Sequence, residues 1–262
     1  MRLLLISVLL AGAVLVQAQD FEGGIYFGAT MYSGDLSPKI LPRYTRFAEP
    51  AGGIVLRYRD RGVLGLRGSL TYGNLRGDDA RSAYPQRKLA FQTKLLEAAV
   101  VGEWYLIPDN FLGDSPLITP YLFMGVGVFH FNPEAQYETG YVELQPLGTE
   151  GQGLKNYERP YSRTQVAIPF GAGLRLLLGK RGFLSLEASA RKIFTDYLDD
   201  VTGAVLDYNR IYEEKGEMAA RLSRPDITPE EAAYISNLYR RGGDWFDAYG
   251  SIGVSYTYRL SR

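Results

Sequence analysis

Strict alternation between apolar and polar residues is the feature that most restricts the fold of this chain. In residues 184–191, Leu, Leu, Ala and Ala alternate with Ser, Glu, Ser and Arg. A repeat of two places successive side chains on opposite faces of an extended chain, so the segment is predicted to be a β-strand with one apolar face. Residues 63–73 and 246–259 show the same pattern with similar clarity.

Five further segments carry a noisier version of the pattern, and one of them, residues 119–131, is apolar on both faces. Most of the eight segments approach the length that a tilted strand needs to cross a bilayer, roughly 9–11 residues. The five segments are residues 24–33, 52–59, 95–105, 119–131 and 164–178.

The connections between these segments alternate in length, which selects the architecture. Residues 60–62 and 179–182 are tight turns, and residues 106–118 are intermediate. Four connections are long: residues 34–50, 75–90, 132–162 and 197–244. In an antiparallel sheet all the long loops then lie at one end, as in bacterial outer-membrane barrels. A soluble β-sandwich or lipocalin-like barrel is the alternative, but neither needs this asymmetry.

We therefore expect an all-β fold, an eight-stranded antiparallel transmembrane up-and-down β-barrel. In hydrocarbon every backbone N–H and C=O group needs a partner, so a spanning sheet must close and leave no edges. The lumen of such a barrel is just wide enough to be filled by side chains, which disfavours a wide pore.

The N-terminus predicts export to the cell outer membrane. Arg2 precedes an apolar run at residues 3–16, and small residues end the run at Ala18. This is the organisation of a secretory signal peptide, so we expect residues 1–18 to be cleaved and residues 19–262 to form the barrel domain. A membrane-anchored N-terminus is the alternative, but the run is short for a span. The sequence contains no Cys, which excludes a lipoprotein anchor, disulfides and thiolate metal sites.

The last long loop is predicted to contain a small helical segment, an insertion at about residues 205–242. Thr228-Pro229-Glu230-Glu231 is a capping box with Pro at the first helical position, and we expect a helix from there to about Arg240. Residues 209–222 resemble a weaker helix interrupted by Gly216. The segment would either cover the barrel mouth as a protective cap or face a partner.

Charged residues are predicted to gather on the inward face of the strands. They would form either an ion path or, more in keeping with a narrow lumen, a plug of ion pairs. These residues are Arg57, Arg67, Glu97, Glu103, Arg175, Glu187, Arg191 and Arg259. The formal net charge of the chain is +0, so no basic field points to nucleic acid.

We expect no enzymatic activity, no catalytic or metal-binding residues and no cofactor. His130 is the only histidine and lies among aromatic residues, where a packed or interfacial role is more common than a catalytic one. Neither a Gly-x-Ser-x-Gly elbow nor a His-Glu-x-x-His motif is present. A barrel enzyme acting on lipid A is the alternative, and it would have to depend on His130.

The final strand carries a polar, glycine, aromatic, aromatic spacing at Ser251, Gly253, Tyr256 and Tyr258. This spacing resembles the signal recognised by the barrel-assembly machinery. The chain departs from that signal by ending in Leu260-Ser261-Arg262 instead of an aromatic residue.

Several segments, in order along the chain, resemble one family of Bacteroidetes outer-membrane barrels. The family is of uncharacterised domain type and includes the PorG component of the type IX secretion system. The segments are residues 32–36 (YSGDL), 120–123 (PYLF), 127–133 (GVFHFNP), 143–153 (ELQPLGTEGQG), 168–171 (IPFG) and 194–201 (FTDYLDDV).

This resemblance implies a structural role in secretion, in which the barrel docks a periplasmic ring. The periplasmic turns would then form the docking surface, with residues 106–117 as its main part. The candidate docking residues are Asp60, Arg61, Pro108, Asp109, Asn110, Asp114, Lys180 and Arg181. The alternative is a general surface barrel for adhesion, ligand binding or envelope stability. In either case outer-membrane lipid and lipopolysaccharide are expected partners.

Overall fold

The computed structural model describes residues 20–37, 47–60, 62–82, 84–108, 116–232, 234, 238–243 and 246–260. The predicted signal peptide, residues 1–18, lies outside these ranges and stays a prediction. Within the described ranges, no helix combines the length and the apolar character that crossing a membrane would require.

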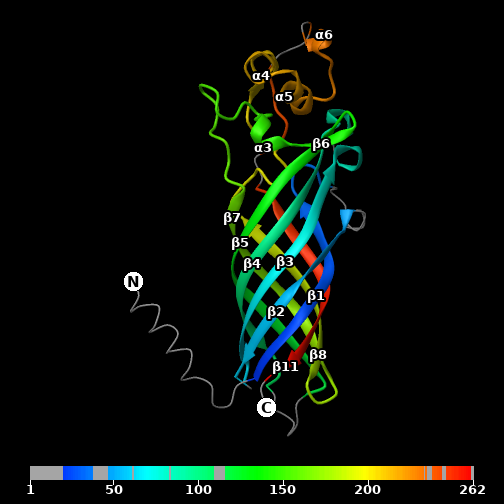
Figure 1. The fold of residues 1–262 in the computed structure, drawn as a ribbon, viewed down its shortest axis with the longest axis vertical. Helices are drawn as coiled ribbons and strands as arrows, with labels where there is room; N and C mark the ends of the chain where they lie inside the picture. Colours follow the sequence, from blue (N-terminus) through cyan, green and yellow to red (C-terminus); the bar gives the residue numbers. More distant parts are fainter. Residues whose placement is uncertain are drawn as a thin grey trace, which may run out of the picture.

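In the described part of the chain, eight strands form a closed antiparallel barrel (Figure 1). Each strand pairs with its neighbours in sequence, and pairing of β1 with β11 closes the wall. The fold is therefore the predicted up-and-down barrel, with a small helical segment in its last long loop. The strands are β1 (Asp20–Ser33), β2 (Glu49–Arg59), β3 (Leu64–Asp78), β4 (Ala90–Tyr105), β5 (Ile118–Tyr137), β7 (Thr164–Leu178), β8 (Gly182–Ile193) and β11 (Ala248–Arg259).

The apolar face of every barrel strand points outward, as the alternation predicts. Phe27 and Val126 have exposed fractions of 65% and 64%, whereas the neighbouring inward positions of the same strands are buried or half-buried. The structure also resolves the ambiguous strand at residues 119–131: Val126 and its even-numbered neighbours face out, and Phe123 and Phe129 face in. An apolar exterior around a closed sheet suits a hydrocarbon environment.

The strands extend further at the long-loop end than predicted. β3 continues to Asp78, β4 begins at Ala90, and β5 runs over 20 residues to Tyr137 before β6 (Gly140–Glu143) pairs back on its end. The loops expected at residues 75–90 and 132–162 are therefore partly strand. Beyond the apolar belt the alternation is reversed: outward positions such as Arg76 and Lys94 are polar, and inward positions such as Leu75, Phe91 and Ala135 are apolar and buried. The apolar outward face by which the strands were recognised therefore ends before the hydrogen-bonded pairing does.

A loop cap, defined as the described parts of residues 138–163 and 194–243, stands over the long-loop end of the barrel (Figure 1). Short 3₁₀ turns at Asp79–Arg81 and Pro85–Arg87 lie between β3 and β4. The cap elements besides β6 are α3 (Leu144–Leu147), β9 (Leu206–Asp207), α4 (Tyr208–Lys215), α5 (Glu217–Ser223), α6 (Pro229–Ala232) and β10 (Leu238–Tyr239).

One helix prediction in the cap is confirmed and the other is wrong. Gly216, at φ 92°, separates α4 from α5, as expected for residues 209–222. The capping box at Thr228 is also present, because the Glu231 N–H donates to Thr228 Oγ1 at 3.3 Å. However, the helix does not reach Arg240, since Leu238–Tyr239 is extended and pairs with β9. A capping box sets where a helix begins, but tertiary pairing decides where it ends.

Candidate functional site

The lumen contains a buried ion network centred on Arg57. This side chain is fully buried, and its guanidinium group faces three carboxylates. Its Nε atom lies 2.8 Å from Oε2 of Glu103, Nη2 lies 3.4 Å from Oε1 of Glu187, and Nη1 lies 3.7 Å from Oε2 of Glu22. The three carboxylates come from β4, β8 and β1, so the network joins strands from around the wall.

Further arginines and tyrosines complete this layer. Arg67 bridges Glu103, at 3.3 Å, and Glu187. Arg175 pairs with Glu22, and its guanidinium carbon lies 3.7 Å from the centroid of the Phe183 ring. The hydroxyl groups of Tyr105 and Tyr121 donate to Glu103 and Glu187. Each of the three carboxylates thus has several partners, which is what buried charge requires.

A second layer lies between the Arg57 network and the cap. Arg191 pairs with Glu97 at 3.1 Å and also donates to Ser251 at 2.8 Å, while the Tyr249 hydroxyl group donates to Glu97. A cavity of about 30 Å³ reaches from this layer to Arg67. That volume holds about one water molecule. The inward charges therefore form a plug. The predicted set of inward charges did not include Glu22, which lies just before the segment recognised as alternating, or Arg59, which is buried at the end of β2.

The barrel mouth is filled by an apolar cluster to which both the wall and the cap contribute. Phe129 and Phe131 from β5 pack there with Tyr161, Leu198 and Val201 of the cap. The rings of Phe131 and Tyr161 are stacked with their centroids 6.0 Å apart. The cap is thus inserted into the mouth, and its helices have an apolar core of their own around Leu206, Tyr208 and Ile211.

Arg241 joins the segments of the cap to one another. Its Nη1 atom donates to Thr149 Oγ1 at 2.8 Å and to the Asp200 carbonyl oxygen at 3.0 Å, and lies 3.7 Å from Glu150 Oε1. Glu150 also accepts hydrogen bonds from the backbone N–H of Thr202, at 2.9 Å, and from its hydroxyl group. Burial nevertheless raises the pKa of Glu150 to about 7.

A second polar junction ties the cap to the wall. The Tyr32 hydroxyl group, at the end of β1, lies within hydrogen-bonding distance of Asp199 and Asp247. Asp199 also accepts the Val201 N–H, and Asp247 accepts the Leu198 N–H, both at 2.9 Å. Burial raises the pKa of both carboxyl groups well above the usual range. The sequence did not show that these acids are buried, because in a loop no periodicity separates buried from exposed charges.

The predicted docking residues fall into two groups. Asp60, Pro108, Lys180 and Arg181 are described and lie in turns at the end of the barrel opposite the cap, where β1 begins and β11 ends (Figure 1). Asp60 is exposed and caps its own turn, accepting the Gly62 N–H at 2.8 Å. Lys180 and Arg181 are exposed after Gly179, which has φ 66°. Arg61, Asp109, Asn110 and Asp114 lie outside the described residues.

The four residues of the predicted assembly signal divide between the two faces of β11. Tyr256 and Tyr258 face outward with exposed fractions of 43% and 45%, and Ser251 faces inward. Gly253 has a packing role of its own. A Cβ atom there would lie 2.5 Å from the carbonyl oxygen of Phe27 and 2.6 Å from the Tyr26 ring.

His130 lies on the outward face of β5, where its Nδ1 atom is 3.0 Å from the Thr164 hydroxyl oxygen on the paired strand. It is exposed and remote from the lumen charges. Across the described ranges, no group of three or more His, Cys, Asp or Glu residues is arranged to hold a metal ion.

Comparisons with known proteins give one family match and several similar structures. A family model described as a domain of unknown function (DUF6089) matches residues 1–213. No curated protein matches the chain. Among solved structures, the chain is similar to Neisserial surface protein A, with 9% identity, a TM-score of 0.45, and coverage of 93% of this chain and 100% of that one.

Two further structures are similar to this chain. One is the attachment invasion locus protein Ail of Yersinia pestis in complex with the heparin analogue sucrose octasulfate, with 9% identity, a TM-score of 0.43, and coverage of 93% and 100%. The other is the N-terminal β-barrel domain of Pseudomonas aeruginosa OprF, with 11% identity, a TM-score of 0.37, and coverage of 92% and 100%.

Proposed function

This chain belongs to the DUF6089 family, a domain family of unknown function, and on that premise we propose that it is a non-enzymatic structural barrel of the outer membrane. We propose further that it serves the type IX protein secretion system by docking a periplasmic ring. The filled lumen is the observation that carries the proposal. Because two ionic layers and an apolar cluster occupy the lumen, the barrel's exposed surfaces, and not a channel, would perform its function.

The turns opposite the cap are the surface that a periplasmic partner would meet. In a bacterial outer-membrane barrel the short turns face the periplasm. Asp60, Lys180 and Arg181 are exposed charges at this end, and exposed charges set the register and rate of association. The ring as partner follows from the resemblance of residues 143–153 and 194–201 to the family that includes the PorG component.

The test is affinity purification of a tagged barrel from gently crosslinked outer membranes, followed by mass spectrometry. We expect ring proteins to accompany the wild-type barrel. With the double variant Lys180→Glu, Arg181→Glu, the amount of co-purified ring protein should fall about tenfold. Charge reversal at Asp109 and Asp114 should have the same effect. The matched control is Lys155→Glu, Arg159→Glu, which reverses two exposed charges in the cap at the other end. A barrel that comes out alone, or with lipopolysaccharide only, would count against the secretion role.

A general surface barrel is the second candidate, and the cap favours it. The cap has its own apolar core yet exposes Tyr141 and Tyr234, with exposed fractions of 57% and 90%. Exposed aromatic side chains on a packed scaffold are common in binding surfaces. Exchanging residues 132–162 and 197–244 for loops of another barrel should then abolish surface binding. Secretion defects caused by turn variants alone would contradict this candidate.

A further inference from the structure

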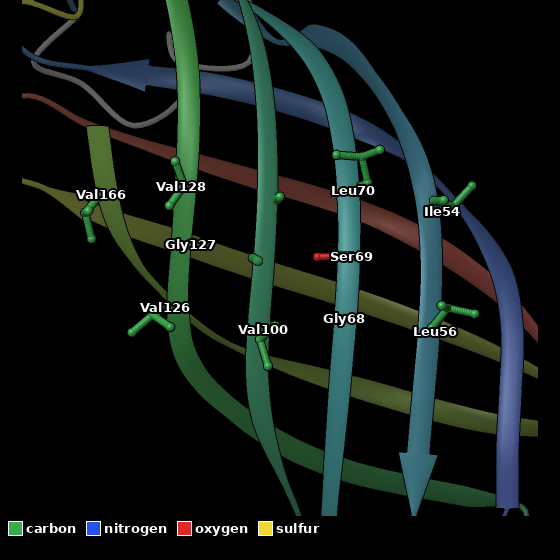
Figure 2. Close-up of a pocket in the computed structure, with 12 residues that line it drawn as sticks. Ile54, Leu56, Gly68, Ser69, Leu70, Val100, Val126, Gly127, Val128 and Val166 are labelled. Carbon is green, nitrogen blue, oxygen red and sulfur yellow. The ribbon is translucent and has the colours of Figure 1, made fainter. Parts of the chain in front are cut away.

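The outer wall of the barrel contains a hollow where the lipid-facing side chains are small. At Gly68 on β3, which lines the hollow, a Cβ atom would meet nothing within 4 Å. Bulky residues from the adjoining strands surround a volume of about 680 Å³, among them Ile54, Val100 and Val126 (Figure 2). Ligand sites typically occupy roughly 300–1,000 Å³.

The hollow lies in the apolar belt, and none of its described lining residues is charged. Leu70 and Val128, which also line it, are both exposed outward with fractions of 44% and 49%. In a membrane the surrounding medium at this depth is acyl chain. A recess with a floor of small residues and walls of branched ones suits an acyl chain, because the chain fills the recess by apolar contact alone.

A polar cavity of about 280 Å³ lies nearer the cap on the same strands. Its lining includes Arg76 on β3 and Lys94 on β4, and the strand register pairs Asn74 with Lys94. The register also pairs Leu70 with Ala98 at the hollow, four residues further from the cap. At roughly 3.4 Å per residue, the two recesses are about 14 Å apart along the strands.

The two cations of the polar cavity are available to a ligand. Arg76 and Lys94 are exposed on the same outward face as Tyr72, and no salt bridge to a described residue engages either of them. The cavity also contains Glu49 on β2 and Glu134 on β5, and Glu134 accepts a hydrogen bond from Gln92 at 3.4 Å. The cations thus lie on the two central strands, with carboxylates on the strands to either side.

This arrangement matches one kind of amphiphile. Arginine and lysine bind phosphate oxygens by charge-assisted hydrogen bonds, and carboxylates accept hydrogen bonds from sugar hydroxyl groups. Tyr72, with an exposed fraction of 50%, lies on β3 between the two recesses, and outward aromatic residues of outer-membrane barrels commonly flank the apolar band. A headgroup at the upper recess would place an attached acyl chain over the lower one.

We propose that the outward face of β2–β5 binds a phosphorylated glycolipid of the surrounding leaflet. Arg76 and Lys94 hold its phosphate group, and the hollow at Gly68 receives one of its acyl chains. The proposal concerns the lipid-facing wall, so it stands or falls separately from docking at the turns.

The experiment uses purified full-length barrel, refolded in detergent without lipid, and native mass spectrometry after addition of lipid A. Wild-type barrel should retain lipid A through detergent exchange, and dephosphorylated lipid A should be retained about tenfold less. The double variant Arg76→Gln, Lys94→Gln should retain about tenfold less lipid A than the wild type. Gly68→Leu, which fills the hollow, should reduce retention by the same factor. The controls are Lys192→Gln and Ala188→Leu, exposed outward positions on β8, and should match the wild type.

Three outcomes would overturn the proposal. The first is equal retention by wild type and by both variants. The second is equal retention of an anionic glycerophospholipid, which would make the site one for any anionic lipid. The third is a second copy of the barrel in place of lipid, seen as a dimer that Gly68→Leu abolishes. No ring protein enters this assay, so a failure of the docking role would leave its result unchanged.

Discussion

The hydroxyl group of Tyr32 donates a hydrogen bond of 2.5 Å to Asp199, a residue 167 positions further along the chain. The same hydroxyl oxygen lies 2.8 Å from Asp247. Burial raises the pKa of both carboxyl groups, which favours their neutral form at this junction. This junction fastens the cap to β1 without an ion pair.

Substitution of Tyr32 by Phe should therefore loosen the cap and leave the barrel folded. Removing the hydroxyl group leaves two buried carboxyl groups short of a partner, at a cost of about 1–3 kcal/mol. We expect proteolysis within the cap to accelerate about tenfold or more, while the heat-modifiable migration of the barrel on a gel is retained. Tyr141→Phe, at an exposed cap position, is the control. Equal cleavage of the two variants would show that the junction does not hold the cap.

The cap should lose stability as pH rises through neutrality. Burial raises the pKa of Glu150 from 4.5 to about 7, so the folded cap binds this proton more tightly than the unfolded chain. The stabilisation is complete below about pH 4.5 and is lost as pH rises through about 7, with a limiting size of roughly 3 kcal/mol. This change in the stability of the cap can be measured by hydrogen exchange at residues 149–152 and 200–202 between pH 4.5 and 8.

Glu150→Gln should flatten this pH dependence, because the amide cannot ionise. Some dependence will remain, since Asp199 and Asp247 also have raised pKa values and act in the same direction. An unchanged slope in the variant would mean that Glu150 does not contribute.

Removal of the central guanidinium group should destabilise the barrel strongly. Arg57→Ala leaves Glu22, Glu103 and Glu187 facing one another in the lumen, and breaking a buried ion network from one side costs about 3–5 kcal/mol. The folded gel band should disappear at a clearly lower temperature. Arg57→Lys keeps the charge but cannot bridge three carboxylates, so it should be intermediate.

The matched control for Arg57 is Arg210→Ala, which removes an exposed ion pair with Glu214 four residues away. Such pairs contribute only about 0.3–0.5 kcal/mol. If Arg57→Ala were as heat-resistant as this control, the ion network would not contribute measurably to the stability of the barrel.

The wild-type barrel should carry no steady ionic current in a planar bilayer. Conduction requires a continuous file of water, and the cavity between the two ionic layers holds about 30 Å³. The double variant Glu97→Ala, Arg191→Ala removes only the layer nearer the cap. It should stay closed too, because the Arg57 layer remains. Open-channel current in the wild type at low voltage would contradict the filled lumen.

Variants of Gly253 and of Tyr258 should impair barrel formation at different stages. Gly253→Val places side-chain atoms against Phe27 and Tyr26, so it should impair folding even in detergent without any cellular machinery. Tyr258→Ala removes an exposed ring and should refold in detergent, yet assemble poorly in cells if the C-terminal spacing is a recognition signal. Normal assembly of Tyr258→Ala in cells would remove the signal hypothesis and leave the packing role of Gly253.

The barrel could be predicted because the alternation within each strand specifies which side chains face outward and which face inward. Along β11, the outward Ile252 and Val254 alternate with the inward Ser251 and Ser255, and this period of two is visible without any tertiary contact. The inward charges, Arg57 among them, could be predicted for the same reason. Glu22 was not predicted because it lies two residues before the segment in which alternation was recognised, and the buried Arg59 was not included among the predicted inward charges.

The cap could not be predicted in the same detail because the contacts that hold it together join residues far apart in the sequence. Arg241 lies in a connection without periodicity, and its hydrogen-bond partner Thr149 is 92 positions away. The helix expected to reach Arg240 failed because Leu238–Tyr239 pairs with β9, a contact that local helix signals do not contain. Asp60, Lys180 and Arg181, predicted as docking residues, are exposed charges in turns, but no sequence pattern identifies a partner for them.

The pairing of β1 with β11 has a consequence for biosynthesis. Glu22, near the start of the barrel, accepts a hydrogen bond from Thr257, near its end, at 2.8 Å. The first strand of the barrel thus keeps one unpaired edge until the last strand pairs with it. A chain truncated before β11 would therefore remain an open sheet, with one edge of β1 and one edge of β8 unpaired.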